Sequence, residues 1–240
     1  MKTGIIVQCR YNSTRFQGKI LKKVNNKTLL EYLIERLKTV FAADIVCIAY
    51  SENPLDKKIS KEIEKFDIKS FMGPEDDVLA RYYYSAKKFD LKNIVRVTSD
   101  CPIIDPSIID NLIRTFKNSN IDYLSNSLER TYPLGMEAEI FNFNLLEKRH
   151  ISSLDQYERE HVTTYMRKSN LIKKKSIKLE NNFSQIRLTL DTVEDFNLIS
   201  IIIKELYPKF GIEFSLKNIL DFLKKNPKLL EINQGITQKT

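Results

Sequence analysis

The sequence is poor in glycine, a residue on which the common phosphate-binding motifs depend. Its 240 residues include six glycines, at positions 4, 18, 73, 135, 211 and 235, so the dinucleotide motif G-x-G-x-x-G is impossible. Gly18-Lys19 resembles the end of a P-loop, but Ser13 stands at the first glycine position and Ile20 replaces the serine or threonine. These absences exclude a dinucleotide-binding dehydrogenase and a Walker-type ATPase, so side chains must hold any bound phosphate.

Histidine, cysteine and long apolar runs are also scarce. His150 and His161 are the only histidines, which excludes a histidine-rich zinc site. No apolar run reaches the roughly 18 residues that span a bilayer, and the start MKTGIIVQC is too short for a signal peptide. Cys9, Cys47 and Cys101 are odd in number and widely spaced, which favours buried reduced thiols over disulfides. We therefore expect a cytoplasmic protein without a membrane partner.

The composition indicates a globular chain with a basic surplus. Hydrophobic residues make up 42% of the chain, and the formal net charge is +8. The lysines are scattered, for example at positions 22, 23, 87, 88, 173–175, 224 and 225. No RNP-type aromatic motif, zinc finger or basic heptad accompanies them. We therefore expect no nucleic-acid partner, and place most of the surplus charge on solvated helix faces.

The first 125 residues alternate between strand and helix. Thr28 and Glu31 form a capping box that opens a helix with apolar residues at helical spacing as far as Phe41. This rhythm indicates an α/β fold with a mostly parallel central sheet covered by helices on both faces. The expected strands are 4–9, 45–49, 68–71, 94–98 and 121–124, and the further expected helices are 54–66, 76–88 and 106–116.

The rhythm breaks after residue 126. Residues 127–185 carry a Pro-Leu-Gly turn, an expected strand at 137–141, a helical stretch at 157–168 and a charged strand at 171–179. We expect this segment to form an inserted α+β lobe, over the site or at a dimer contact, within a single domain of residues 1–240. After it we expect a strand at 186–190 and helices at 192–206 and 216–223.

The segment IIVQCRYNSTRFQGKIL joins a buried strand to a loop that carries Arg10, Arg15 and Lys19. Three cations on one loop at a strand end suit a polyanion such as a nucleoside triphosphate. The alternative is a solvated basic loop, because charge runs usually face water.

Two aspartates follow expected strands. Asp100 lies in VRVTSDCPIIDP, where a carboxylate just past a strand faces the crevice in which open α/β sheets bind ligands. The alternative for such a residue is a turn or helix cap, and we assign Asp105 to helix capping. In RLTLDTVEDF, Asp191 ends a strand, whereas Glu194 and Asp195 are explained by the following helix N-terminus. Two strand-end carboxylates suit Mg²⁺, which prefers a few carboxylates plus phosphate oxygens.

These stretches resemble motifs of the CMP-sugar synthetases, which include the CMP-Kdo and acylneuraminate cytidylyltransferases and their spore-coat polysaccharide relatives. The shared patterns are R-x-x-S-x-R-x-x-G-K-x-L, G-D-x-P-x-I-D-P and D-T-x-E-D, with Gln17 in place of a usual proline and Ser99 in place of a glycine. GPEDDVLARY, YPLGMEAEIF and REHVTTYM resemble further family segments, and the resemblance runs from residue 4 to about 200.

The resemblance implies a Rossmann-like nucleotide-diphospho-sugar transferase fold, a homodimer through about 127–180, and Mg²⁺ on Asp100 and Asp191. Arg10, Arg15 and Lys19 would be the catalytic cations. The implied nucleotide-binding residues are Gln8, Arg10, Asn12, Ser13, Arg15, Lys19, Asp77, Arg81 and Asp100. The implied acceptor-binding residues are Glu137, Glu139, Arg159, Glu160 and His161, although surface charge or a subunit contact also explains the last three.

The function implied is transfer of CMP from CTP to an acidic sugar of the nonulosonic type, with release of pyrophosphate, in cell-surface polysaccharide synthesis. One alternative keeps the reaction and takes a sugar phosphate, polyol phosphate or phosphonate as acceptor. The other is a non-catalytic subunit that binds a nucleotide or polyanion.

Overall fold

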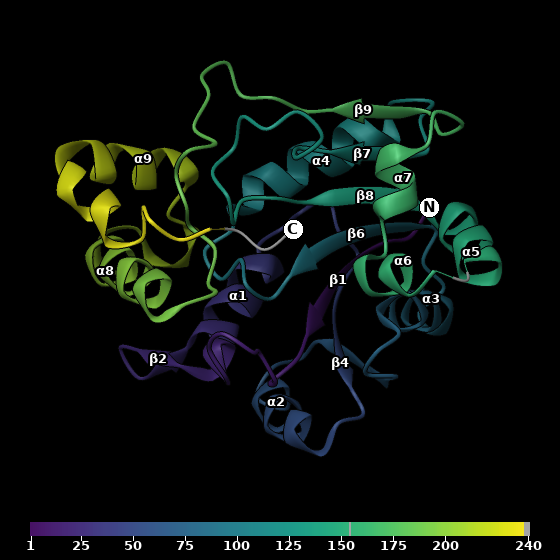
Figure 1. Cartoon of the computed structure of the whole chain (residues 1–240), viewed down its shortest axis with the longest axis horizontal. Coiled ribbons are helices and arrows are strands. Elements are labelled where there is room, and N and C mark those ends of the chain that lie inside the picture. The colour runs from purple at the N-terminus through teal and green to yellow at the C-terminus, as the bar shows by residue number, and fades with distance from the viewer. Residues whose placement is uncertain (154, 238–240) are drawn as a thin grey trace.

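The computed structural model describes residues 1–153 and 155–237. In this part of the chain, seven strands form one sheet in the order β5-β4-β1-β6-β8-β7-β9 (Figure 1). Only β8 runs against its neighbours within this sheet, so the mostly parallel sheet expected from the sequence is confirmed. Its strands are β1 Thr3–Cys9, β4 Ile45–Ser51, β5 Lys69–Gly73, β6 Asn93–Thr98, β7 Tyr123–Ser125, β8 Glu139–Asn142 and β9 Lys174–Ser176.

The central strand β1 is buried on both faces. Ile5, Ile6 and Val7 have no exposed surface, and such β-branched residues suit a parallel strand covered by helices above and below. β1 pairs in parallel with β4 on one side and with β6 on the other, so the carboxyl ends of all three strands lie at one edge of the sheet.

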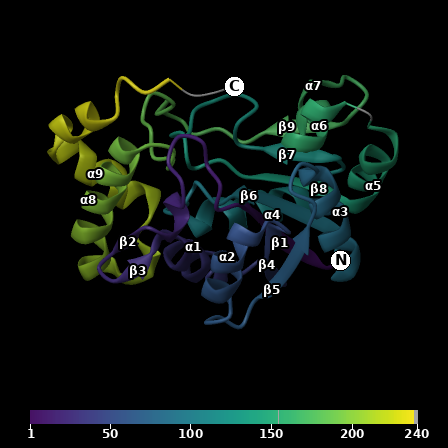
Figure 2. The same cartoon turned by 60° about the horizontal axis from the view of Figure 1, so that its bottom comes forward.

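Helices cover both faces, as expected (Figures 1 and 2). One apolar cluster packs α1, α2, α4, α8 and α9 against the sheet, and a second packs α3, α5 and α7 against the other face. The helices are α1 Leu29–Lys38, α2 Lys57–Ile63, α3 Val78–Lys88, α4 Pro106–Lys117, α5 Phe143–Ser152, α6 Gln156–His161, α7 Thr164–Lys168, α8 Val193–Phe210 and α9 Leu216–Lys225. Smaller elements are the hairpin β2 Lys23–Val24 and β3 Lys27–Thr28, and the 3-10 turns η1 Lys19–Leu21, η2 Pro54–Asp56, η3 Gly211–Glu213 and η4 Pro227–Ile232.

The segment 127–185 contributes to the central sheet as well as to a layer over it. β8 lies between β6 and β7, and β9 forms the edge beside β7. The helical stretch expected at 157–168 is interrupted, because Val162 adopts φ 60° and separates α6 from α7. The strand expected at 171–179 is confined to Lys174–Ser176.

The prediction of a strand at 186–190 is wrong. These residues form an extended segment with a single β-bridge, between Leu134 and Arg187. The physical reason is a change of partner along the segment: the Leu188 N–H donates to the Leu134 carbonyl, whereas the Leu190 N–H donates to the Asp100 carbonyl. No continuous ladder forms, yet the segment is tied to the loop after β6.

Several local predictions are confirmed. Thr28 and Glu31 form the capping box of α1. Asp105 caps α4 by accepting from the Ser107 N–H at 2.8 Å, and its second oxygen accepts from the Leu216 N–H. The three cysteines are free and buried. Within residues 1–153 and 155–237, no helix combines the length and the apolar content that crossing a bilayer requires.

Candidate functional site

The expected site residues lie where the strand order reverses. The chain places β4 and β5 on one side of β1 and then crosses to place β6 on the other side. Open α/β sheets bind their ligands outside the carboxyl ends of the strands at such a switch point. The loop from Arg10 to Gly18 leaves β1 at this edge, and Figure 2 shows it in purple beside the green segment that leads into α8.

The basic loop is closed by its own backbone and by Asp56. The Gly18 N–H donates to the Tyr11 carbonyl at 2.9 Å, and the Tyr11 N–H donates to Asp56 Oδ1 at 2.7 Å. Gly18 has φ 65°, and a Cβ there would lie 2.8 Å from the Tyr11 ring, so glycine is required. Asp56 also accepts from the Ser51 N–H at the end of β4. These bonds hold the loop in place although Gln17 replaces the usual proline.

The loop cations meet Asp191. Lys19 Nζ lies 2.7 Å from Asp191 Oδ1, and Arg15 Nη2 lies 2.9 Å from Asp191 Oδ2. Lys19 Nζ also lies 3.9 Å from Asp100 Oδ2. Burial alone would raise the pKa of the Asp191 carboxyl, but Lys19, Arg15 and Arg187 outweigh it and lower that pKa below its ordinary value. Asp191 is therefore ionised at neutral pH.

Asp100 is brought beside Asp191 by the backbone. The Asp100 carbonyl accepts from the Leu190 N–H at 2.8 Å and from Thr189 Oγ1 at 3.1 Å. The carboxylates of two segments far apart in sequence thus share one place, with Lys19 contacting both.

The donor set suits a hard divalent cation shared with a ligand. Asp100 and Asp191 supply two carboxylates, and the Asp100 side chain is 30% exposed. Across the described residues, no group of three or more histidine, cysteine, aspartate or glutamate side chains is arranged to enclose a metal ion. Mg²⁺ fits a site of this kind, since it keeps waters and substrate phosphates in its shell and needs only one or two carboxylates. The metal stays a prediction.

Four other residues expected to bind the nucleotide lie on β1 and in the loop that follows it. Arg10 and Asn12 are exposed, and Ser13 is partly buried. Gln8 Oε1 accepts from Arg96 Nη2 at 3.1 Å. Because arginine can only donate, the Gln8 amide must turn its oxygen toward Arg96 and keep its NH₂ group for another partner.

Asp77 and Arg81, expected to bind the nucleotide, take different positions. Asp77 caps α3 through the Ala80 N–H at 2.8 Å and accepts from Arg159 Nε at 2.8 Å. Arg81 is 2% exposed, and its Nη1 lies 3.4 Å from the Cys9 carbonyl at the end of β1. Burial lowers the pKa of Arg81, and the nearby Arg10 adds to this effect. Arg159, which was expected to bind the acceptor, thus contacts Asp77, which was expected to bind the nucleotide.

Glu139 lies in a closed buried network. Its side chain is paired with Arg96 at 2.9 Å and Arg167 at 2.7 Å, and accepts from Tyr123 at 2.6 Å. Burial would raise the pKa of Glu139, but the two arginines lower it below its ordinary value. The residue is 3% exposed. The structure therefore does not present Glu139 to an acceptor, and the carboxylate joins β6, β8 and α7.

Glu137 lies nearer the centre. Its Oε2 accepts from the Gly135 N–H at 2.6 Å. Burial raises the pKa of Glu137 to about 7, and the Asp100 charge acts in the same direction. Glu160 is exposed on α6, and the His161 ring lies 4.2 Å from the Tyr157 ring.

Sequence reasoning missed Arg187 and Asp56. Arg187 Nη2 lies 3.3 Å from Asp191 Oδ2, and its Nε donates to Asp195 Oδ1 at 2.8 Å. The signal was an arginine four residues before Asp191, but this spacing predicts contact only on a helix. No comparable pattern marked Asp56.

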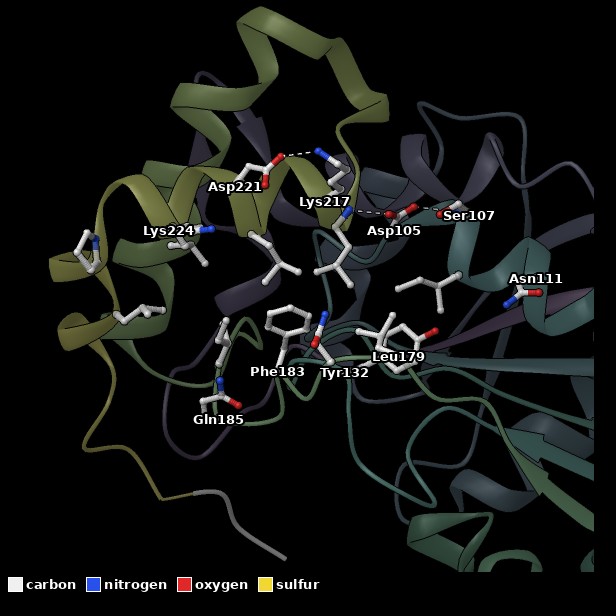
Figure 3. Close-up of a pocket in the computed structure, with 18 residues that line it drawn as sticks. Asp105, Ser107, Asn111, Tyr132, Leu179, Phe183, Gln185, Lys217, Asp221 and Lys224 are labelled. Carbon is white, nitrogen blue, oxygen red and sulfur yellow. Dashed lines mark hydrogen bonds and ion pairs between the residues drawn. The ribbon is translucent and has the colours of Figure 1, made fainter.

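A concave region of about 1050 Å³ lies away from this cluster, between α9, the start of α4 and the segment 179–186 (Figure 3). Its walls include the apolar side chains of Tyr132, Phe183 and Leu223. Lys217 at its rim is paired with Asp221 at 2.7 Å. Among the described residues that line it, none was expected at the nucleotide site. The nucleotide site stays predicted at the strand ends, where cations and carboxylates meet.

Comparison with known proteins identifies related sequences and a related fold. The family model described as cytidylyltransferase matches residues 4–234. The spore coat polysaccharide biosynthesis protein SpsF of Bacillus subtilis is 32% identical, over 92% of this chain and 94% of its own length. A 3-deoxy-manno-octulosonate cytidylyltransferase of Hydrogenovibrio crunogenus is 30% identical, over 58% of this chain and 57% of its own length. A solved cytidylyltransferase structure from Leptospira borgpetersenii matches all of both chains, with a TM-score of 0.92 and 34% identity.

The fold is that of the nucleotidyltransferases, and the Rossmann-like nucleotide-diphospho-sugar transferase fold expected from the sequence is confirmed. The chain belongs to the cytidylyltransferase family.

Proposed function

We propose that the protein transfers CMP from CTP to an acidic sugar of the nonulosonic type and releases pyrophosphate, as a step in cell-surface polysaccharide synthesis. The observation that carries this proposal is the contact of Arg15 and Lys19 with Asp191, beside Asp100. One place at the strand ends thus holds cations for a triphosphate and carboxylates for a divalent cation. The names of the relatives above support CTP as donor and a sugar acid as acceptor.

The reaction is an in-line displacement at phosphorus. The oxygen of an acceptor hydroxyl attacks the α-phosphorus and its proton passes to water. A new P–O bond forms, and the bond to the bridging oxygen breaks so that pyrophosphate leaves with the electron pair. Arg10, Arg15 and Lys19 bind the triphosphate and neutralise the charge that grows on the leaving group. Mg²⁺ held by Asp100 and Asp191 would add Lewis-acid stabilisation of charge at the α-phosphate. The closed loop keeps Arg15 and Lys19 in position, so the chain spends little free energy on ordering them.

The acceptor is proposed to lie on the α6 side of the carboxylates. Glu137 is close enough to Asp100 for their charges to interact, and Glu160 and His161 are accessible on α6. Arg159 is held by Asp77 and by the carbonyl of Ser153, which fixes its guanidinium there. A fixed guanidinium is well suited to bind the carboxylate of an acidic sugar.

A homodimer formed through residues 127–180, and a cytoplasmic setting, belong to the same proposal. Within this range Phe141 is wholly buried in a single subunit, so its side chain is not part of the proposed interface. Tyr157 is 48% exposed, Leu171 is 88% exposed and Ile151 is 73% exposed, so this segment still offers apolar surface. Light scattering should give twice the 28.1 kDa mass of the chain, and a monomer at every concentration would contradict the dimer.

The test is a screen of pyrophosphate release. CTP, UTP, ATP and GTP are each combined with acidic sugars, sugar phosphates, polyol phosphates and phosphonates in the presence of Mg²⁺. We expect turnover with CTP and an acidic sugar. Turnover with CTP and a sugar phosphate or phosphonate would keep cytidylyl transfer and replace the acceptor. Binding of CTP without turnover on any acceptor would leave the non-catalytic subunit.

A further inference from the structure

Asp195 has more partners than a helix cap needs. The capping box explains its contacts with Thr192, whose N–H donates to Asp195 Oδ2 at 3.1 Å. The side chain has no exposed surface, and it also accepts from Arg187 Nε and Nη2, each at 2.8 Å. The Asp191 N–H donates to Asp195 Oδ2 at 2.9 Å. A buried carboxylate thus binds both the backbone of Asp191 and the arginine beside its side chain.

Arg187 passes this constraint to the Asp191 side chain. Two parallel hydrogen bonds to Asp195 fix the orientation of its planar guanidinium. In that orientation Nη2 reaches Asp191 Oδ2 at 3.3 Å. Arg187 thus orients the Asp191 carboxylate together with Arg15 and Lys19, and its share depends on where Asp195 holds it.

Asn233 completes the cluster from the other end of the chain. It follows η4, which packs against α8 and α9, and Figure 1 shows this yellow segment returning from α9 toward the sheet. Asn233 is 3% exposed, and its Nδ2 donates to Asp195 Oδ1 at 2.8 Å and to the Arg187 carbonyl at 3.1 Å. One amide group thus holds both the side chain of Asp195 and the backbone of Arg187.

We infer that Asn233 is a positioning residue for the nucleotide site: through Asp195 and Arg187 it sets the orientation of the Asp191 carboxylate. This inference rests on the proposed role of Asp191 in holding a divalent cation against the phosphates. It assigns the C-terminal segment a part in the site, although the hydrogen bonds of Asn233 go to Asp195 and Arg187, neither of which was expected to bind the nucleotide or the metal. Residues that orient a metal-binding carboxylate typically change metal affinity about 10- to 100-fold when replaced.

The competing explanation is that Asn233 only anchors the C-terminal segment. A matched control is Asn226, an exposed residue of the same segment whose Nδ2 donates to the Phe222 carbonyl at 2.9 Å at the end of α9. Asn226→Ala removes an anchoring bond without reaching Asp195. Asn233→Asp keeps the size of the side chain and places an acceptor against Asp195 Oδ1, so it should disturb the cluster more than Asn233→Ala does.

The experiment titrates Mg²⁺ into the full-length protein holding inorganic triphosphate, a probe that assumes no base and no acceptor. Calorimetry gives the Mg²⁺ affinity, and thermal melting gives stability, for wild type and the three variants. We expect Asn233→Ala to weaken Mg²⁺ binding about tenfold or more, and Asn233→Asp to weaken it further. We expect Asn226→Ala to keep the Mg²⁺ affinity of wild type even where its melting temperature falls as far as that of Asn233→Ala. Equal Mg²⁺ affinity in Asn233→Ala and Asn226→Ala would overturn the inference, as would a wild type that binds no Mg²⁺ with triphosphate. A wild type that binds both yet transfers no CMP would defeat the proposed function alone, and the affinities would still decide the role of Asn233.

Discussion

Lys19 Nζ lies 2.7 Å from Asp191 Oδ1, an ion pair between the loop after β1 and the segment before α8. Arg15 holds the other oxygen of the same carboxylate at 2.9 Å. The cations proposed for the triphosphate are thus paired with a carboxylate proposed for the metal. Binding of Mg²⁺ at Asp191 and of phosphates at Arg15 and Lys19 should therefore favour one another, because each ligand replaces one half of these ion pairs.

This pairing predicts an unusual consequence of Asp191→Asn. In EDTA, the variant should bind inorganic triphosphate more tightly than wild type, since Arg15 and Lys19 no longer interact with a competing anion. A gain of about 1 kcal/mol corresponds to about fivefold in the dissociation constant. With Mg²⁺ present the order should reverse. Calorimetry under both conditions checks this, and weaker triphosphate binding by the variant in EDTA would show that Asp191 does not compete for the cations.

Arg10 should contribute to nucleotide binding without contributing to stability. It is exposed, and among the described residues it makes no hydrogen bond or ion pair, unlike Arg15 and Lys19. Arg10→Ala should raise the KM for the nucleotide about tenfold or more, the scale of a lost charge-assisted phosphate contact, with an unchanged melting temperature. Arg114→Ala, at an exposed arginine of α4, is the matched control. Equal kinetics in the two variants would remove Arg10 from the site.

Glu139 and Glu137 should respond in opposite ways to replacement by glutamine. Glu139→Gln leaves Arg96 and Arg167 in a buried network without their carboxylate, and breaking such a pair costs about 3–5 kcal/mol of unfolding free energy. Denaturant unfolding at neutral pH measures this loss. A variant as stable as wild type would mean that the carboxylate is available for an acceptor after all.

Glu137 predicts a pH dependence. Its pKa in the folded protein is about 7, above the ordinary 4.5. Between these values the unfolded chain has released the proton and the folded chain has kept it, so stability falls as pH rises through this window. The contribution is up to about 3 kcal/mol, since one unit is worth about 1.4 kcal/mol. Without metal, Glu137→Gln should therefore gain stability relative to wild type from pH 5 to pH 8, and a constant difference would contradict the raised pKa.

The sequence was sufficient to predict that Lys19, Asp100 and Asp191 lie together, because each of them follows a local pattern in the chain. Asp100 was predicted just after a parallel strand. In an open α/β fold the carboxyl ends of parallel strands lie at one edge of the sheet, where ligands bind. Asp191 was placed correctly for a different reason from the one expected. It follows an extended segment rather than a strand, and backbone bonds to the loop of Asp100 bring it there.

What the sequence could not show depends on register and on the path of the chain. Glu139 meets Arg96 because β8 pairs antiparallel with β6 in one register, and it meets Arg167 because the chain turns at Val162. Asp195 was explained by its helix cap, and its contacts with Arg187 and Asn233 depend on where the C-terminal segment returns. These pairs satisfy buried charges, a requirement that composition alone does not locate.

Pyrophosphate release by Asp100→Asn, Asp191→Asn and Asp105→Asn tests the proposed site most directly. The first two variants remove an anionic metal ligand and should lower kcat/KM about 100-fold or more, since Lewis-acid stabilisation of a phosphoryl group is worth several kcal/mol. Asp105→Asn should melt at a lower temperature, because Asp105 accepts two backbone N–H groups, yet turn over nearly as wild type. Normal turnover in Asp100→Asn and Asp191→Asn would show that both aspartates are structural and that the chemistry lies elsewhere.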